Sequence, residues 1–166
     1  MILPGHIAAA VLCHRYAAAD LPVAMAASLA PDVVDKAVYY GTSLSPSSRL
    51  PMHTLWGWFG TTLLVALIGL VCARAATWTY AWFLSYGVHL LCDSGLVGDD
   101  LPLLYPLVSY ELNSPPFPLA YLLDPATWPW PKLIAEAIVV AWAAWIVWRQ
   151  SVRGQGSARH TNVARP

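Results

Sequence analysis

Long stretches without formal charge do most to set the class of this chain. Residues 54–73 and residues 75–92 contain no Asp, Glu, Lys or Arg, and residues 133–148 are interrupted only by Glu136. A helix of about 20 apolar residues is long enough to cross a hydrocarbon core of ~30 Å. These stretches therefore predict an integral membrane protein built from helices.

The composition supports the same class. The chain has 166 residues, of which 58% are hydrophobic and 11% charged, whereas a soluble domain averages about 25% charged residues. The formal net charge is zero, so no nucleic-acid partner is expected. The expected partner is the lipid bilayer, and the length favours one domain. The oligomeric state cannot be read from the sequence.

The order of apolar and turn-forming segments predicts an all-α, polytopic transmembrane bundle. We expect an N-terminal helical hairpin (residues 5–19 and 22–30, with Pro31 and Asp32 opening the next segment) and about three further spans at 53–73, 77–94 and 132–149. Residues 95–131 are rich in proline and are predicted to form a loop with short interfacial helices. Residues 1–149 would form the membrane domain, and residues 150–166 a disordered cytoplasmic tail.

The few histidines and aspartates in and beside these apolar segments follow helical spacing. His89 and Asp93 lie four residues apart, and Asp32 and Asp35 lie three apart. Residues at these spacings share one helix face. Bare carboxylates and imidazoles are expensive in an apolar setting unless they are paired or bind a cation. Together with His6 and His53, which open the first and third apolar segments, they predict a metal site.

Helix length supports this convergence. At ~1.5 Å per residue, His6 and His89 each stand roughly 20 Å from the turn that joins their helix to its neighbour, and His53 roughly 30 Å from its turn. All the candidate ligands are thus expected toward one membrane face. Positive residues favour the cytoplasm. They are concentrated on the turn side, so the site is predicted to face outward and the C-terminus inward: Arg15, Arg74, Arg149, Arg153, Arg159 and Arg165.

Each candidate also has a structural alternative. His89 and Asp93 can form a hydrogen-bonded pair inside a bundle, and Asp32 and Asp35 can cap the start of a helix. His53 can be an interfacial histidine, and His6 can face solvent. Glu136 is expected either to face the site or to contact another helix.

The donor types favour a divalent metal. Imidazole nitrogens and carboxylate oxygens bind zinc at ~2.0–2.2 Å, with manganese or iron as alternatives and one or two ions in the site. Such an ion polarises a phosphoryl or acyl oxygen and lowers the pKa of bound water. Asp35 could bridge two metals or accept a proton. Lys36 and Arg49 could meet an anionic group, or could be an interfacial lysine and a solvated loop residue.

At these residues the sequence resembles the membrane-bound metal-dependent hydrolase family, the LexA-regulated inner-membrane hydrolase-like proteins. The matching elements occur in one order: Gly5-His6, Leu29-Ala-Pro-Asp-Val-Val-Asp-Lys36, Arg49-x-x-x-His53-Thr-Leu55, Gly87-Val-His-Leu-Leu-Cys-Asp93 and Leu103-Leu-Tyr-Pro106. The resemblance implies an inner-membrane helical protein whose metal ligands are His6, Asp32, Asp35, His53, His89 and Asp93. Ser48 and Val34 stand where many members carry other residues. A more distant likeness to zinc-dependent phospholipase C hints at phosphoesters.

These features lead to three alternative functions. The first is metal-dependent hydrolysis of a phosphoester or lipid-linked substrate. The second is a non-catalytic binding or regulatory membrane protein with a structural or degenerate metal site. The third is an ion or metal transporter, which would need polar groups across the full membrane depth, and the turn-side half of the chain is poor in them.

Overall fold

The computed structural model describes residues 3–42, 44–94, 101–112 and 130–163. Five helices lie in this part of the chain, and no strand does: α1 (Leu3–Ala17), α2 (Leu21–Gly41), α3 (Leu55–Val71), α4 (Ala75–Ser94) and α6 (Trp130–Val163). The all-α prediction is confirmed for these residues. Residues 95–100 and 113–129, where short interfacial helices were expected, lie outside the described residues.

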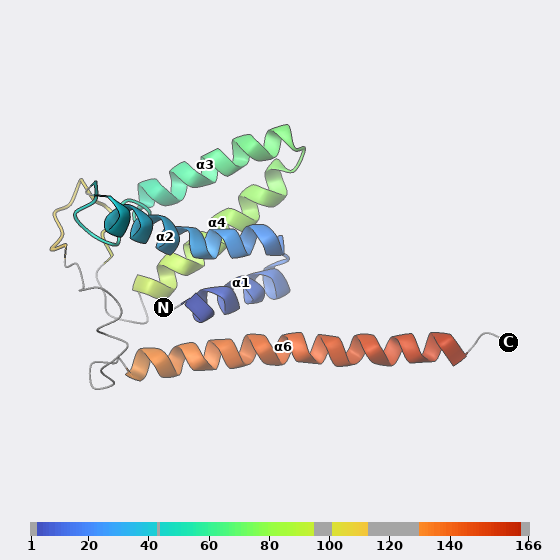
Figure 1. The fold of residues 1–166 in the computed structure, drawn as a ribbon. Helices are drawn as coiled ribbons and strands as arrows, with labels where there is room; N and C mark the ends of the chain where they lie inside the picture. Colours follow the sequence, from blue (N-terminus) through green and yellow to red (C-terminus); the bar gives the residue numbers. More distant parts are fainter. Residues whose placement is uncertain (1–2, 43, 95–100, 113–129, 164–166) are drawn as a thin grey trace.

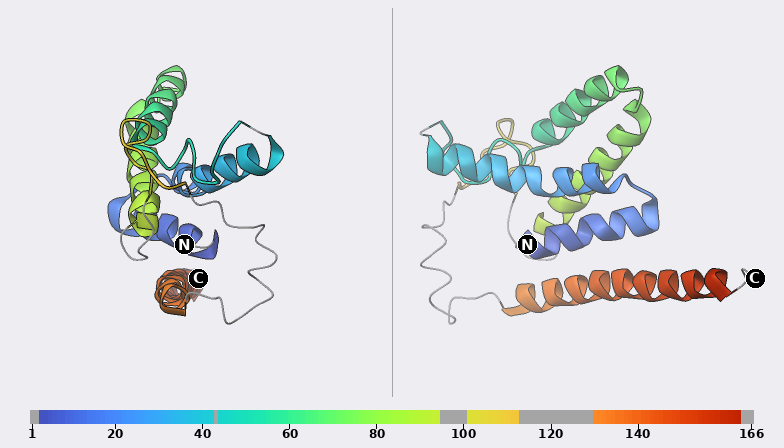
Figure 2. Two further views of the ribbon diagram at one scale, coloured as in Figure 1. Left: turned by 90° about the vertical axis from the view of Figure 1, so that its left-hand side faces the viewer. Right: turned by 45° about the vertical axis from the view of Figure 1, so that its right-hand side comes forward.

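The helices pack as two hairpins with one long helix beside them. α1 packs on α2 and α3 packs on α4, while α4 also contacts α1 and α2. α6 packs on α1 and extends beyond its end (Figures 1 and 2). The α1–α2 and α3–α4 turns lie at one end of this group, and the start of α1 and the end of α4 lie at the other (Figure 1). This path is the one that the sequence predicts for the candidate ligands.

Small side chains let the first, second and fourth helices approach closely. Ala10, Ala24 and Ala81 are fully buried in one cluster at their contact. Alanine brings no bulk and no polar group into a helix contact, so backbones can pack tightly. This close approach brings residues from different helices within ligand distance of each other at the far end of the bundle.

The second helix continues where the sequence predicts a break. α2 runs through Pro31, with Asp20 as its N-cap accepting a hydrogen bond from the Val23 N–H at 3.2 Å. A proline inside a helix removes one backbone hydrogen bond, but here tertiary packing carries the helix through, because Pro31 is fully buried. Asp32 and Asp35 both lie well inside α2, so the alternative that they cap the start of a helix is wrong.

One helix in the described part of the chain is long and apolar enough to cross a membrane, the stretch Leu133–Val152 of α6. α3 is apolar but has 17 residues, or ~26 Å of rise. Its predicted start at His53 moves to Leu55 because Thr54 caps the helix, its Oγ1 accepting from the Gly57 N–H at 3.0 Å. The polytopic arrangement therefore stays a prediction.

The outward surfaces of α3 and α6 are nonetheless apolar. Leu63, Leu67 and Leu70 of α3 and Ile138 and Trp142 of α6 are all exposed. Contiguous apolar surface of this kind marks contact with a membrane or another protein. α6 also continues past Arg149 to Val163, where the sequence predicts a disordered tail; no proline interrupts this stretch before residue 166.

Candidate metal centre

Four segments bring the candidate ligands together at one end of the bundle. His6 comes from the first turns of α1, Asp32 from α2, His53 from the loop before α3, and His89 and Asp93 from α4. His6, His53 and His89 are almost completely buried, with exposed fractions of 0%, 1% and 0%. Imidazoles removed from water in this way need partners for their ring nitrogens.

A backbone carbonyl fixes the ring of His89. Its Nδ1 lies 2.8 Å from the carbonyl oxygen of Ser28. A carbonyl can only accept, so Nδ1 carries the proton, and the neutral ring presents the lone pair of Nε2. Burial lets no water satisfy that lone pair. His89 therefore offers Nε2 to whatever occupies the centre of the cluster.

A buried carboxylate fixes the ring of His53 in the same way. His53 Nδ1 lies 2.7 Å from Asp35 Oδ2, which also accepts the His53 backbone N–H at 3.2 Å. The other oxygen of Asp35 accepts the Met52 N–H at 2.7 Å. A carboxylate behind one ring nitrogen, with the other nitrogen free to bind metal, is the usual support of a metal-ligating histidine.

The two Nε2 atoms meet at 3.1 Å. With both rings neutral, two lone pairs would face each other in a buried place, and this arrangement needs a proton or a metal ion between them. Ligands ~2.0 Å from one tetrahedral ion lie ~3.3 Å apart, close to the observed separation. The donor chemistry of these two side chains thus fits a shared cation.

Two carboxylates complete this group. Asp93 Oδ2 lies 3.5 Å from His53 Nε2 and 3.8 Å from His89 Nε2, and Asp32 Oδ1 lies 4.0 Å from His53 Nε2. Ligand atoms of these four residues all lie within 4.8 Å of one another. The structure therefore shows a His/Asp group that can hold a metal ion, as the sequence predicts.

The same carboxylates govern the protonation of His53. Burial opposes its charged form, but the hydrogen bond from its ring to Asp35 and the nearby Asp93 carboxylate outweigh burial and raise the pKa of His53 above its ordinary value. The carboxylates around His53 therefore favour positive charge on its ring.

His6 lies against the group without a directed hydrogen bond. Its Nε2 is 3.2 Å from Asp32 Oδ2 and 3.7 Å from Asp93 Oδ1, yet neither ring nitrogen makes a hydrogen bond of acceptable geometry. Its ring also stacks on that of His89, with centroids 4.1 Å apart. A buried imidazole with unsatisfied nitrogens beside two carboxylates could supply a fifth donor to this site.

The structure places the other predicted site residues around this group. Asp35 lies behind His53, and its two oxygens accept hydrogen bonds from Met52 and His53; its role as a bridge between metals stays a prediction. Lys36, with 48% of its side chain exposed, pairs with Asp32. Arg49 lies partly buried in the loop that carries His53, its backbone N–H donating to Ser47 Oγ at 3.2 Å.

Three further residues support the group. The sequence does not predict Ser28 or Tyr86 as site residues, and it leaves two alternatives for Glu136. Ser28 holds His89 through its carbonyl and the His6 carbonyl through its hydroxyl, at 2.8 Å each. Tyr86 donates its hydroxyl to the Met52 carbonyl at 2.6 Å and so secures the His53 loop. Glu136 of α6 accepts the Gly5 N–H at 2.9 Å, so it contacts another helix, next to His6. Ser28 stands four residues before Asp32, and Tyr86 stands three residues before His89. This helical spacing is the feature of the sequence that could have identified them.

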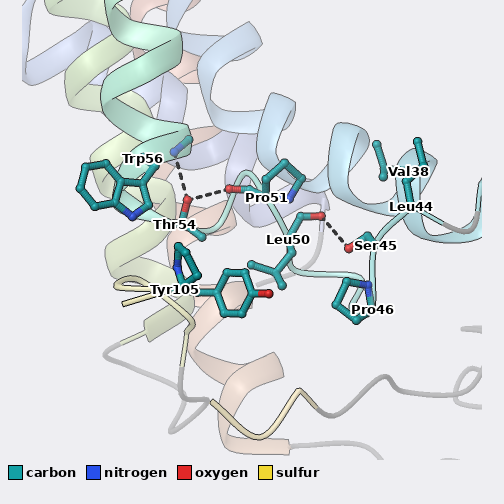
Figure 3. Close-up of a pocket in the computed structure, with 11 residues that line it drawn as sticks. Val38, Leu44, Ser45, Pro46, Leu50, Pro51, Thr54, Trp56 and Tyr105 are labelled. Atoms are coloured by element: carbon teal, nitrogen blue, oxygen red, sulfur yellow. Dashed lines mark hydrogen bonds between the residues drawn. The ribbon is translucent and has the colours of Figure 1, made fainter. Parts of the chain in front are cut away.

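An apolar cavity of about 710 Å³ adjoins the loop that carries His53. Leu50, Pro51 and Thr54 of this loop line it on both sides of His53, together with Trp56 of α3 (Figure 3). Tyr105 and Pro106 line it from the segment after α4, where the Leu103 carbonyl accepts the Leu55 N–H at 2.9 Å. The cavity has the size and apolar lining of a small-molecule site.

A family comparison covers almost the whole chain. The model of one protein family, described as YdjM inner membrane protein, matches residues 2–156. The chain belongs to the YdjM inner membrane protein family. No curated protein and no solved structure matches it. The inner-membrane location predicted for this chain is thereby confirmed, while the hydrolase activity and the likeness to phospholipase C stay predictions.

Proposed function

We propose that this inner-membrane protein is a metal-dependent hydrolase that cleaves a phosphoester in a lipid-linked substrate. The observation that carries the proposal is the 3.1 Å approach of His53 Nε2 to His89 Nε2. Each Nδ1 is committed to an oxygen acceptor. The resemblance to metal-dependent hydrolases, and the apolar cavity beside the same loop, support the choice of reaction and substrate class.

In this scheme the ligands are Asp32, His53, His89 and Asp93, with His6 beside them. Asp35 and the Ser28 carbonyl hold the two imidazoles in the tautomer that binds metal. A divalent ion bound there would polarise a phosphoryl oxygen and lower the pKa of a water molecule. Zinc is the first choice for these N/O donors, with manganese or iron as alternatives.

The substrate's anionic group would meet the exposed side of the centre. Lys36 already contacts the Asp32 carboxylate and its side chain is about half exposed, so it could attract a phosphate near the metal ligands. Arg49 lies four residues before His53 and can supply a bidentate contact to the same group. The apolar cavity between Leu50 and Trp56 would take the substrate's hydrocarbon portion.

One observation favours the structural-site alternative. Four protein ligands close the coordination of a single tetrahedral zinc ion, as in structural sites, whereas catalytic sites keep a position open. With His6 as a fifth donor, these residues could hold two ions, and the donors would then not close the coordination of either one. We therefore expect two ions in an enzyme and one ion in a structural site.

The test begins with the full-length protein purified in detergent. Bound metal is measured by mass spectrometry, and turnover is assayed on a generic phosphodiester and a phospholipid panel. His89→Ala should lose metal and turnover, and the near-isosteric Asp93→Asn should lose most of both while remaining folded by circular dichroism. His14→Ala is the matched control, because His14 lies in α1 with its ring bonded to the Ala19 carbonyl.

The possible outcomes separate the alternatives. Metal with turnover that depends on His89 supports the enzyme. Metal without turnover on any substrate favours a structural site. A wild-type protein that binds no metal when reconstituted with zinc, manganese or iron removes the proposal.

A further inference from the structure

A second pocket lies at the other end of α1, between this helix and α6. It has a volume of about 210 Å³ and is lined by Arg15, Tyr16, Trp145, Ile146, Arg149 and Gln150. α1 and α6 run side by side in the same direction (Figures 1 and 2). Their starts are joined by the bond between Gly5 and Glu136, and the pocket lies where α1 ends.

Two arginines line this pocket, and no acidic residue is among the described residues that line it. In the described part of the chain, neither Arg15 nor Arg149 forms an ion pair. Arg149 instead lies over the ring of Trp145, 4.6 Å from its centroid, and Tyr16 packs near Trp142 with ring centroids 5.6 Å apart. The contact with Trp145 restrains the Arg149 guanidinium, and Arg15 adds a second positive charge to the lining of the pocket.

The position of the pocket on α6 indicates its depth. Arg149 lies near the end of the stretch Leu133–Val152 that is long and apolar enough to cross a membrane. Glu136, at the metal-centre end of the same stretch, is ~20 Å away by helix rise. Arginine beside tryptophan and tyrosine at the end of an apolar helix is typical of the membrane–water interface. The pocket thus lies at the level of lipid headgroups, on the face away from the metal centre.

We propose that this pocket binds the phosphate of an anionic phospholipid headgroup. Charge complementarity is the main argument, because two arginines can each donate paired N–H groups to phosphate oxygens. Basic pockets between membrane helices bind acidic headgroups in this manner. The volume accommodates a phosphate with a small glycerol group, and the aromatic side chains lie where acyl chains would begin. The site is separate from the proposed catalytic centre and does not depend on it.

The test compares lipid retention in full-length variants. The protein is purified from mixed vesicles of phosphatidylglycerol and phosphatidylcholine, and retained lipid is measured by native mass spectrometry. The double variant Arg15→Gln/Arg149→Gln should lower the excess of phosphatidylglycerol over phosphatidylcholine at least tenfold. Arg74→Gln is the matched control, since Arg74 is an exposed arginine of the α3–α4 turn outside the pocket. Circular dichroism and metal content, which should not change, report folding.

Three results would overturn the proposal. One is equal retention of the two lipids by the wild type. Another is an equal loss in Arg74→Gln, which would indicate attraction by overall surface charge. The third comes from titration with inorganic phosphate: if free phosphate displaces the lipid at micromolar concentration, the pocket is a site for a soluble anion. Lipid excess that persists at millimolar phosphate and is lost only in the double variant supports the proposal.

Discussion

The Nε2 atoms of His53 and His89 lie 3.1 Å apart in the interior of the helical group. The two rings come from segments 36 residues apart in sequence, and each is held from behind by an oxygen acceptor. Two buried imidazoles whose free lone pairs meet are stable only with a positive charge between them. This relationship turns a set of scattered histidines into a candidate metal centre.

Asp35→Asn should weaken metal binding without removing any of the four gathered ligands. The two oxygens of Asp35 accept from Met52 N–H and from the backbone and ring of His53. An amide has one oxygen, so one buried donor would face an NH₂ group, at a cost of about 1–3 kcal/mol. Loss of such a supporting partner typically lowers metal affinity ~10–100-fold.

The measurement for Asp35→Asn is metal affinity by competition with a chelator, alongside the thermal unfolding midpoint. Asp20→Asn is the matched control, because Asp20 caps α2 at the opposite end and asparagine caps a helix almost as well as aspartate. Unchanged affinity in Asp35→Asn would show that the orientation of His53 does not depend on this carboxylate.

His6→Ala tests the number of metal ions. Its Nε2 lies within 4 Å of both Asp32 and Asp93, which places it to complete a second site. We expect the variant to fall from two bound ions per chain to one and to lose turnover, while His53 and His89 keep the remaining ion. The measurement is the metal-to-protein ratio of the wild type and of His6→Ala, obtained by mass spectrometry. Two ions in both proteins would exclude His6 as a ligand, and one ion in the wild type would favour a structural site.

Gly57→Ala should disturb the loop that carries His53. A Cβ at Gly57 would lie 2.8 Å from the backbone carbonyl oxygens of both Pro51 and Met52, which is closer than real Cβ contacts. The loop would have to move, and His53 with it, so both metal affinity and thermal stability should fall. Gly60→Ala is the control in the same helix, where nothing lies within 4 Å and alanine gains about 1 kcal/mol of helix propensity. Equal metal affinity and thermal stability in the two variants would contradict the close approach of Gly57 to the carbonyl oxygens of Pro51 and Met52.

Spacing along the chain predicts which histidines and aspartates gather at this end of the bundle, but not the residues that support them. His89 and Asp93 share a face because they are four residues apart, and the return of each helix hairpin brings His6 and Asp32 to the same end. Asp32 and Asp35 also share a face by spacing, so both were expected to bind metal. The structure gives them different surroundings, because Met52 and His53 donate hydrogen bonds to the two oxygens of Asp35.

Other features leave little trace in a sequence. The carbonyl of Ser28, which sets the tautomer of His89, is a backbone group that any residue would supply. The continuation of α2 through Pro31 depends on packing that a local pattern does not contain. The helix between Trp130 and Val163 extends further than its apolar stretch, since polar residues after Arg149 end the hydrophobic signal without ending the helix.

Glu136 should couple the stretch of α6 that is long and apolar enough to cross a membrane to the candidate metal centre. The Glu136 carboxylate accepts the N–H of Gly5, the residue before His6, at 2.9 Å, and Glu136 is 5% exposed. Glu136→Ala would leave a buried N–H unsatisfied, which costs about 1–3 kcal/mol, and would loosen the start of α1. We expect a lower unfolding midpoint and weaker metal binding, whereas Glu136→Gln keeps an oxygen acceptor and should retain most of both. The coupling is absent if Glu136→Ala matches the wild type in metal affinity.

Cysteine accessibility tests the predicted membrane orientation. Cys72 is exposed at the α3–α4 turn, and the distribution of arginines predicts that this turn faces the cytoplasm. Leu44, 85% exposed in the loop before His53, is predicted outside. In a background with Cys13 and Cys92 replaced by alanine, a membrane-impermeant maleimide added to intact spheroplasts should label Leu44→Cys and spare Cys72. Both positions should react once the membrane is permeabilised. Labelling of Cys72 in intact spheroplasts with protection of Leu44→Cys would reverse the orientation, and labelling of both from outside would show that α3 does not cross the membrane.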